Sequence, residues 1–351
     1  MIWRLLLYPI TMLYGGITHF RNKLFDWQVL SSQQYGLPVI SVGNITVGGT
    51  GKTPLSEYII GLLQDEHQVA LLSRGYKRQT KGALIAQPNS TAGEIGDEPF
   101  QMLRKFPQLK GAVAEKRVEG MELLLRQVKP DVIILDDAYQ HRYVKPGLSL
   151  LVIDYNRPLW NDFPFPAGNL RETQAGQKRA NLIVVNKCPV GMTQSEKSDW
   201  IKKINPLDHQ QVFFSTIGYG DPKSMVMNHN QPTQSPSVSI IGLAGIARPE
   251  VFFSYLKTRF NVRETLVFPD HHNFTSSDVA KIISVFDAQG SDTLLVTTEK
   301  DAVRLNELEV LPDAYKKRIC YIPIELKILF DETTIFDKLI TDYVGNNQRN
   351  S

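Results

Sequence analysis

Short apolar runs alternate with amphipathic stretches along most of the chain. The runs are rich in Val, Ile and Leu, as is typical of strands buried on both faces of a parallel sheet, and the stretches between them carry apolar residues at helical spacing. The runs are residues 37–42, 68–72, 110–114, 131–137, 148–154 and 180–186. This alternation predicts an α/β fold in which helices cover both faces of a mostly parallel sheet.

The same alternation begins again after residue 239. Strands are expected at 239–245, 265–268, 293–296 and 320–324, with helices at 249–260 and 276–286. Gly, Pro and polar residues near 218–222 and 231–236 bracket a possible hairpin between the two sets. We therefore expect an N-terminal helix over residues 1–30, a larger α/β domain over 31–210, a linker or hairpin over 211–236, and a smaller α/β domain over 237–351.

The first 30 residues predict an amphipathic helix. Leu6, Ile10, Leu13, Ile17, Phe20 and Leu24 recur at spacings of four and three, and polar residues gather opposite them. Residues 5–17 are uncharged but fall short of the roughly 20 needed to span a bilayer, and no signal-peptide cleavage site follows them. Attachment to a membrane surface is favoured, and packing on the protein's own core is the alternative.

A glycine-rich segment, Gly-Asn-Ile-Thr-Val-Gly-Gly-Thr-Gly-Lys-Thr-Pro over residues 43–54, joins the first strand to a helix. This is the context of a phosphate-binding P-loop, although the strict motif has glycine where this chain has Thr46. The expected nucleotide-binding residues are Gly48, Gly49, Thr50, Gly51, Lys52 and Thr53. Lys52 would reach the β- and γ-phosphates, and the Thr53 hydroxyl would bind Mg²⁺. A glycine-rich turn without a ligand is the alternative.

Acidic residues end the apolar run 131–137. Asp136 and Asp137 have the form of a Walker B strand, whose aspartate orients Mg²⁺. Asn186-Lys187 is similar to the guanine-reading Asn-Lys-x-Asp of GTPases, but Pro189 stands in place of the carboxylate. The missing carboxylate counts against guanine specificity.

Three loops carry further candidate chemistry. Arg74 follows a strand, where ligands collect in open α/β sheets, although a solvated basic turn explains it equally well. Asp97 precedes a helix that begins near Pro99, so a helix cap and a general base are equal interpretations. His271 and His272 lie on a loop, where a surface histidine is the simpler interpretation.

Composition narrows these possibilities only slightly. The net charge of +3 gives little indication of nucleic acid or another polyanion as a partner. Only two cysteines occur, Cys188 and Cys320, so disulfides do not organise the fold. A nucleotide site and few cysteines together favour the reducing cytosol.

Seven motifs follow one another in a fixed order: GNITVGGTGKTP at 43–54, SRGY at 73–76, GDEP at 96–99, LDDAYQH at 135–141, PAGNLRE at 166–172, FPDH at 268–271 and TEKDAV at 298–303. In this arrangement the chain resembles the tetraacyldisaccharide 4'-kinase family, the lipid A 4'-kinases of Gram-negative bacteria. The resemblance covers nearly the whole chain. Ala138 and Tyr139 depart from it, because the family usually has Gly and Phe there.

The resemblance implies a P-loop kinase that moves the γ-phosphoryl group of ATP, with Mg²⁺, to the 4'-hydroxyl of a tetraacylated glucosamine disaccharide 1-phosphate. It implies that Asp97 and His271 form a pair that activates this hydroxyl, and that Asp136 and Asp137 serve the metal. The residues expected to line the active site are Arg74, Gln140, His141, Arg171 and Glu172.

The implied location is the cytoplasmic face of the bacterial inner membrane, because moving acyl chains into water costs about 0.8 kcal/mol per CH₂. The membrane surface is then a partner, and no obligate protein partner is inferred. Two other functions remain open from the residues alone. One is a P-loop ATPase or GTPase switch, and the other is a membrane-bound module that senses nucleotide without catalysis.

Overall fold

A computed structural model of the 351-residue chain describes residues 7–226, 237–270, 272–290, 292–306 and 308–347. Its described residues form two compact units, each presented by itself below. The first unit comprises those within Met1–Ile217 and Leu326–Ser351, and the second those within Gly218–Glu325. The chain therefore passes from one unit to the other twice.

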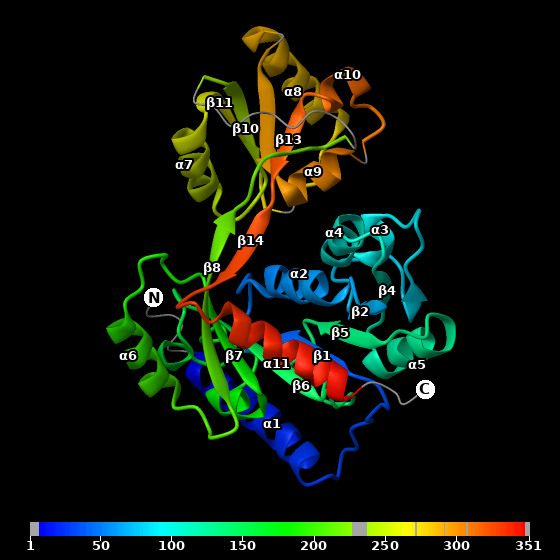
Figure 1. The fold of residues 1–351 in the computed structure, drawn as a ribbon, viewed down its shortest axis with the longest axis vertical. Coiled ribbons are helices and arrows are strands. Elements are labelled where there is room, and N and C mark those ends of the chain that lie inside the picture. Colours follow the sequence, from blue (N-terminus) through cyan, green and yellow to red (C-terminus); the bar gives the residue numbers. More distant parts are fainter. Residues whose placement is uncertain (1–6, 227–236, 271, 291, 307, 348–351) are drawn as a thin grey trace. The chain divides into compact units, whose positions relative to one another are not determined.

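A nine-stranded sheet forms the centre of the first unit (Figure 1). Its strand order is β14-β8-β7-β6-β1-β5-β2-β4-β3. The strands from β8 to β4 in this order pair in parallel, and β3 joins β4 antiparallel. The bounds are β1 Val39–Gly43, β2 Val69–Ser73, β3 Leu84–Ile85, β4 Lys110–Val113, β5 Val132–Asp136, β6 Leu148–Asp154, β7 Leu182–Asn186, β8 Gln211–Tyr219 and β14 Ile324–Ile328.

Helices cover both faces of this sheet because alternate strand residues point to opposite sides. On β1, Ile40 and Val42 pack with α2, Lys52–Leu63, and α11, Thr333–Asn346, whereas Val39 packs with α5, Arg117–Gln127. Helix α4, Asp97–Lys105, lies on the face of α2, and α6, Gln194–Ile204, lies on the opposite face. The predicted mostly parallel α/β architecture is confirmed.

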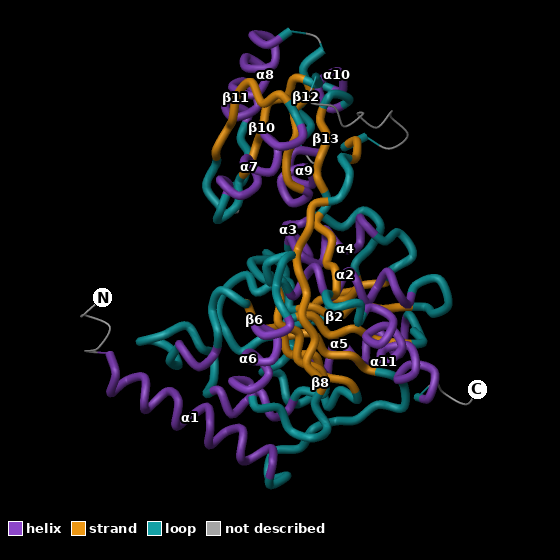
Figure 2. Tube along the Cα trace, turned by 60° about the vertical axis from the view of Figure 1, so that its left-hand side comes forward, coloured by secondary structure: helices purple, strands orange, loops and turns teal. Residues whose placement is uncertain are grey.

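Helix α1, Tyr8–Asp26, lies at the periphery of the first unit, as Figure 2 shows. Its partners are loop segments: Tyr8 and Tyr14 make edge-on ring contacts with Phe163 and Phe165, and Phe25 does so with Tyr143. The remaining short helices of the unit are α3, Ala92–Ile95, and the 3₁₀ helices η2, Leu159–Asn161, and η3, Gln174–Arg179.

The second unit contains a five-stranded sheet in the order β11-β10-β12-β13-β9. Its first four strands are parallel, and β9 is antiparallel. Helix α7 packs on one face, and α8 and α9 pack on the other. The bounds are β9 Lys223–Ser224, β10 Ser239–Ala244, α7 Pro249–Arg259, β11 Asn261–Val267, α8 Ser276–Gln289, β12 Leu294–Thr298, α9 Glu299–Asn306, α10 Asp313–Lys316 and β13 Ile319–Ile322.

The units differ from the expected domains at two places. Residues 211–219, expected in a linker, form strand β8, which pairs with β7. The end of the chain, expected in the C-terminal domain, returns to the first unit, where Phe336 and Ile340 of α11 are fully buried against its core. Both differences depend on long-range packing that local pattern does not encode. Residues 227–236, part of the expected hairpin, lie outside the described residues.

Candidate active site

The turn between β1 and α2 has the geometry of a phosphate-binding loop. Gly48 and Gly51 have φ angles of 95° and 94°, which side chains disfavour. Gly51 caps α2, and no side chain in the described part of the chain hydrogen-bonds to the first amides of that helix. These amides and the helix dipole suit an anion. Gly48, Gly49, Thr50, Gly51, Lys52 and Thr53 therefore lie where the sequence predicts a phosphate site.

Asn44 holds the loop from beneath. Its side chain is fully buried, and its amide donates to the Thr50 hydroxyl over 2.8 Å. A second segment pairs with the first half of the loop: the amide of Arg171 donates to Ile45 and that of Val47 donates to Asn169, each over 2.7 Å. The loop that carries Arg171 is thereby fixed against the P-loop.

Asp137 lies beside the P-loop lysine. Its carboxylate is 3.5 Å from the Lys52 ammonium and 3.0 Å from the Arg171 guanidinium. Although burial opposes the shift, these two cations hold the pKa of Asp137 below its usual range. Lys52, Asp137 and Arg171 thus form a charged cluster at the carboxyl ends of β1 and β5.

The neighbouring Asp136 has the opposite electrostatic character. It is fully buried at the end of β5, and one carboxylate oxygen accepts a hydrogen bond from Ser56 over 3.0 Å. Its other oxygen has no hydrogen-bond partner among the described residues. Burial and the negative charges of Glu98 and Asp137 raise the pKa of Asp136 to about 7. A cation placed here would stabilise the ionised form.

The donor set fits Mg²⁺ in the manner of phosphoryl-transfer sites. The described residues contain no group of three or more His, Cys, Asp or Glu side chains that would hold a metal on its own. Mg²⁺ bound with a nucleotide needs only a hydroxyl and one or two carboxylates, because phosphates and water complete its shell. The hydroxyl of Thr53 and the unpaired oxygen of Asp136 meet that requirement.

Glu172 supports the site from below instead of lining it. It is 3% exposed and forms two hydrogen bonds with Arg179, over 2.8 and 2.9 Å. It also accepts from Gln140 and from Asn22 of α1, each over 2.9 Å. The Gln140 amide also donates to the backbone of Asn44 over 2.8 Å. Glu172 and Gln140 therefore connect α1 and the loop carrying Arg171 to the base of the P-loop.

Three basic side chains lie near one another: Arg74 directly after β2, Arg117 at the start of α5, and His141 in the loop after β5. His141 is buried in large part, and this burial and the nearby charges of Arg117 and Arg74 lower its pKa to about 4. Arg117 is 2% exposed, and two of its guanidinium nitrogens have no partner among the described residues. Sequence reasoning missed Arg117, and its position at the start of the helix that follows a parallel strand was the available signal.

Of the expected Asp97–His271 pair, the structure describes only Asp97. Asp97 is the first residue of α4, and the adjacent Glu98 is close enough to raise the pKa of Asp136. The start of α4 therefore lies near Asp136 at the end of β5. His271 lies outside the described residues, so its pairing with Asp97 stays a prediction.

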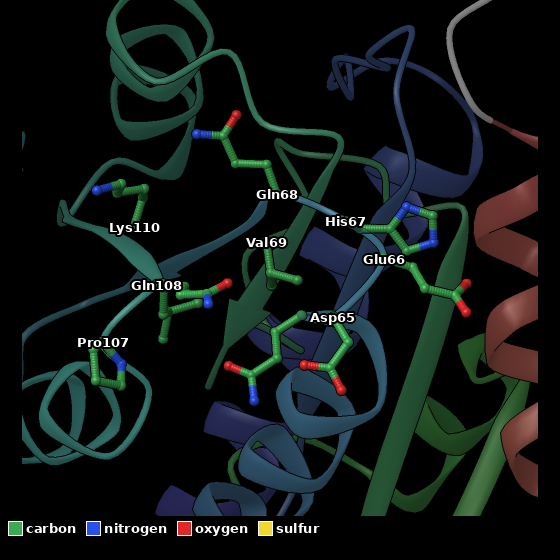
Figure 3. Close-up of a pocket in the computed structure, with 10 residues that line it drawn as sticks. Asp65, Glu66, His67, Gln68, Val69, Pro107, Gln108 and Lys110 are labelled. Carbon is green, nitrogen blue, oxygen red and sulfur yellow. The ribbon is translucent and has the colours of Figure 1, made fainter.

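A hollow of about 600 Å³ lies elsewhere on the first unit. Figure 3 shows its lining, which comes from the segments that precede β2 and β4, residues 64–69 and 107–110. Because β1, β5, β2 and β4 are parallel, this hollow is at the amino ends of the strands and the P-loop is at the carboxyl ends. The hollow is thus separate from the site.

Comparison with known proteins gives one family. A family model described as tetraacyldisaccharide-1-P 4'-kinase matches residues 3–344. The tetraacyldisaccharide 4'-kinase of Bacteroides thetaiotaomicron is 43% identical, with 98% of this chain and 94% of that protein covered. The protein of that name from Flavobacterium johnsoniae is 42% identical, with 98% of each covered.

A solved structure agrees with these matches. The crystal structure of LpxK from Aquifex aeolicus in complex with ATP superposes with a TM-score of 0.76 at 29% identity. The superposition covers 97% of this chain and 99% of that one. The likeness therefore extends over the whole described fold.

Proposed function

Since this chain belongs to the tetraacyldisaccharide-1-phosphate 4'-kinase family, we propose that it transfers the γ-phosphoryl group of ATP to the 4'-hydroxyl of an acylated glucosamine disaccharide 1-phosphate. The product is the 1,4'-bisphosphate, an intermediate of lipid A biosynthesis. The observation that carries the proposal is the P-loop, whose Lys52 lies 3.5 Å from an acidic residue at the end of β5.

Positioning and charge neutralisation account for most of the catalysis expected here. The amides from Gly48 to Thr53 would hold the phosphates, and Lys52 would neutralise charge on the β- and γ-phosphates. Arg171 contacts the same carboxylate as Lys52, so the entry of a nucleotide would allow both cations to turn from Asp137 towards the phosphates. In the absence of nucleotide, Asp137 would therefore hold Lys52 and Arg171 close to the position of the phosphates.

Thr53, Asp136 and Asp137 would hold Mg²⁺, which supplies charge neutralisation between the phosphates when bound. Ionised Asp136 is disfavoured by its buried surroundings. A cation next to its unpaired oxygen favours ionisation, so these residues bind the metal together with the nucleotide rather than before it.

The acceptor hydroxyl needs a base, because a sugar hydroxyl is a poor nucleophile at neutral pH. We assign this role to Asp97, which begins α4 on the same side of the sheet as the P-loop, and we assign its orientation to His271. Arg74, Gln140 and His141 would line the path of the disaccharide. Glu172 is assigned to the support of this wall, since its contacts are with protein groups.

The outward face of α1 supports attachment to a membrane surface. Leu13, Ile17 and Phe20 are 66%, 59% and 58% exposed, whereas the polar Thr11 is 3% exposed and faces the protein. A helix packed on its own core would show the reverse arrangement. No helix in the described part of the chain has the length and apolarity to cross a bilayer. The location that fits is peripheral, on the cytoplasmic face of the inner membrane.

The kinase assignment is tested by ATP-dependent phosphorylation of a purified tetraacyl disaccharide 1-phosphate in detergent micelles. The wild type should give the 1,4'-bisphosphate. Asp97→Ala should lose turnover by a factor of about 10²–10⁴ while its affinity for ATP is retained. ATP consumption without a phosphorylated lipid would contradict the proposal and favour a hydrolytic switch.

Membrane attachment is tested with anionic lipid vesicles. The double substitution Leu13→Ser and Ile17→Ser should weaken binding at least tenfold, because each exposed side chain contributes about 1.5–3 kcal/mol when buried in lipid. His19→Ser, on an exposed position of the same helix, is the control. Equal binding by all three proteins would show that α1 is not the membrane contact.

A further inference from the structure

The backbone carbonyls on the outer side of the P-loop are hydrogen-bond acceptors whose donors must be accounted for. When successive amides of a loop converge on an anion, the carbonyls of the same peptide groups point away from it. Donors that bind these outward carbonyls would hold the amides convergent, both at the exposed carbonyls of Val47 and Gly49 and at the buried carbonyl of Thr50. The donors in this chain come from outside the loop.

Side chains at or just after the ends of two neighbouring strands donate hydrogen bonds to four of these carbonyls. Arg157, in the loop after β6, donates to the carbonyl of Val47 over 3.1 Å. Asn186, the last residue of β7, donates to the carbonyls of Thr50 and Gly51 over 3.2 and 3.4 Å. The ammonium of Lys187 donates to the carbonyl of Gly49.

Asp154, the last residue of β6, fixes the two cations of this group. Its carboxylate is 2.9 Å from the Lys187 ammonium and 3.3 Å from the Arg157 guanidinium, and it is 4% exposed. Although burial opposes the shift, the hydrogen bond from Lys187 holds the pKa of Asp154 below its usual range. Asp154 is therefore a buried anion that holds two donors against the loop.

The orientation of Asn186 is determined by its surroundings. Its side-chain oxygen accepts from the Ser215 hydroxyl over 3.0 Å and from the Lys187 amide over 2.7 Å. The Lys187 amide can only donate, so it requires the Asn186 oxygen at that position, and the NH₂ group is the one that faces the loop. A Cβ at Gly51 would lie 1.9 Å from this NH₂ group, which explains the glycine there.

We propose that Asp154, Arg157, Asn186 and Lys187, here called the carbonyl clamp, hold the P-loop in its phosphate-binding conformation before nucleotide arrives. The inference rests on the proposed function only in taking ATP as the ligand. Its members are positioning residues. They contact the carbonyl oxygens of the P-loop, whereas the amides of the loop would bind phosphate. Asn186 and Lys187, which resemble part of a guanine-reading motif, thereby serve the loop itself.

Two isosteric substitutions remove the clamp contacts with little change of shape. Asn186→Asp replaces the NH₂ donor by an acceptor that repels the Thr50 and Gly51 carbonyls. Lys187→Met keeps the aliphatic stem but loses the ammonium. Lys197→Met is the matched control, because it removes an ion pair of 2.6 Å to Glu332 within the same unit and has no contact with the loop among those described.

Nucleotide binding to the full-length protein is measured by calorimetry with ATP and Mg²⁺, without lipid. We expect each clamp variant to weaken ATP binding about tenfold, because Lys187→Met loses a charge-assisted hydrogen bond and Asn186→Asp exchanges two hydrogen bonds for repulsion between oxygens. We expect Lys197→Met to change ATP binding less than twofold. In turnover assays the KM for ATP should rise by the same factor, with the KM for the lipid acceptor unchanged. Because the binding assay needs no lipid product, it remains informative if the kinase proposal fails.

Amide hydrogen exchange in the apo protein separates preorganisation from a general loss of stability. Residues 48–52 should exchange faster in Lys187→Met, with β5 and β6 unchanged. Lys187 is partly exposed, so this variant is expected to fold even if Asn186→Asp does not. Wild-type ATP affinity in Lys187→Met, or faster exchange over the whole first unit, would overturn the proposal.

Discussion

The turn from β1 to α2 and the turn from β12 to α9 both lead from a parallel strand into a helix. In the second unit, the Asp301 carboxylate satisfies its own turn: it accepts from the Thr298 hydroxyl over 2.7 Å and from the Gly245 amide over 2.8 Å. Asp301 is fully buried, and Arg304 lies 3.4 Å from it. The Asp301 amide, in the first turn of α9, donates in turn to the Thr298 hydroxyl over 3.2 Å, so this donor is used within the protein.

The P-loop of the first unit leaves its corresponding donors open. No side chain in the described residues caps α2, and the polar side chains around the loop contact its carbonyls instead. A helix N-terminus becomes a binding site when the protein satisfies the outside of the turn and leaves the inside to the ligand. The same strand-to-helix unit thereby serves binding in one place and stability in the other.

The largest expected effect is on turnover, from Lys52→Ala. Loss of the ammonium removes charge neutralisation from the phosphates, so turnover should fall about 10³-fold or more. Unfolding in urea should change little, because the neighbouring Arg171 still pairs with Asp137. Lys202→Ala, at an exposed position, is the control. Turnover within tenfold of wild type would show that the P-loop lysine takes no part in the reaction.

The reverse pattern is expected for Asp301→Ala. Three donors lose their acceptor inside the second unit, so the unfolding free energy of that unit should fall by about 3 kcal/mol. ATP affinity of the folded protein should stay within about twofold of wild type. Amide exchange in β10 and β12 reports the stability, and calorimetry reports the affinity. An intact stability with lost ATP binding would make this turn part of the nucleotide site.

His141 should make the stability of the first unit depend on pH. Its surroundings lower its pKa from 6.5 to about 4, so the folded state resists protonation that the unfolded state accepts. The stability linked to His141 is complete above about pH 6.5 and is lost as the pH falls towards 4, an effect of up to about 3 kcal/mol.

His141→Gln should therefore flatten the loss of stability between pH 6.5 and 4, measured as urea midpoints of the first unit. His209→Gln, at an exposed position, is the control. The same slope in His141→Gln and wild type would show that burial of this imidazole does not oppose its charge.

The smallest effects come from a matched pair of threonines. Thr298→Val removes a hydrogen bond to buried Asp301 and should lower the unfolding free energy by about 1 kcal/mol, with turnover unchanged. Thr53→Val should lower turnover and leave stability within about 0.5 kcal/mol, because the proposed role of its hydroxyl is to bind Mg²⁺. Similar outcomes for both variants would contradict the distinction between the β1–α2 turn, which binds a ligand, and the β12–α9 turn, which stabilises the protein.

Much of the site could be predicted because its signals are local. The residues from Gly48 to Thr53 and the pair Asp136 and Asp137 each combine a short motif with an apolar strand, and both motifs lie at strand ends as expected. Ser56 gave no comparable signal. It acts through Asp136, which is distant in sequence, so only the fold brings the pair together.

The sequence by itself determined the parallel α/β architecture and the P-loop, since periodicity and glycine spacing act over a few residues. Tertiary structure decided which face of α1 is exposed, the return of α11 to the first unit, and the contrast between Asp136 and Asp137. It also decided that Asn186 and Lys187 contact the P-loop carbonyls. These features depend on burial and on charges brought together by long-range packing, which no local pattern specifies.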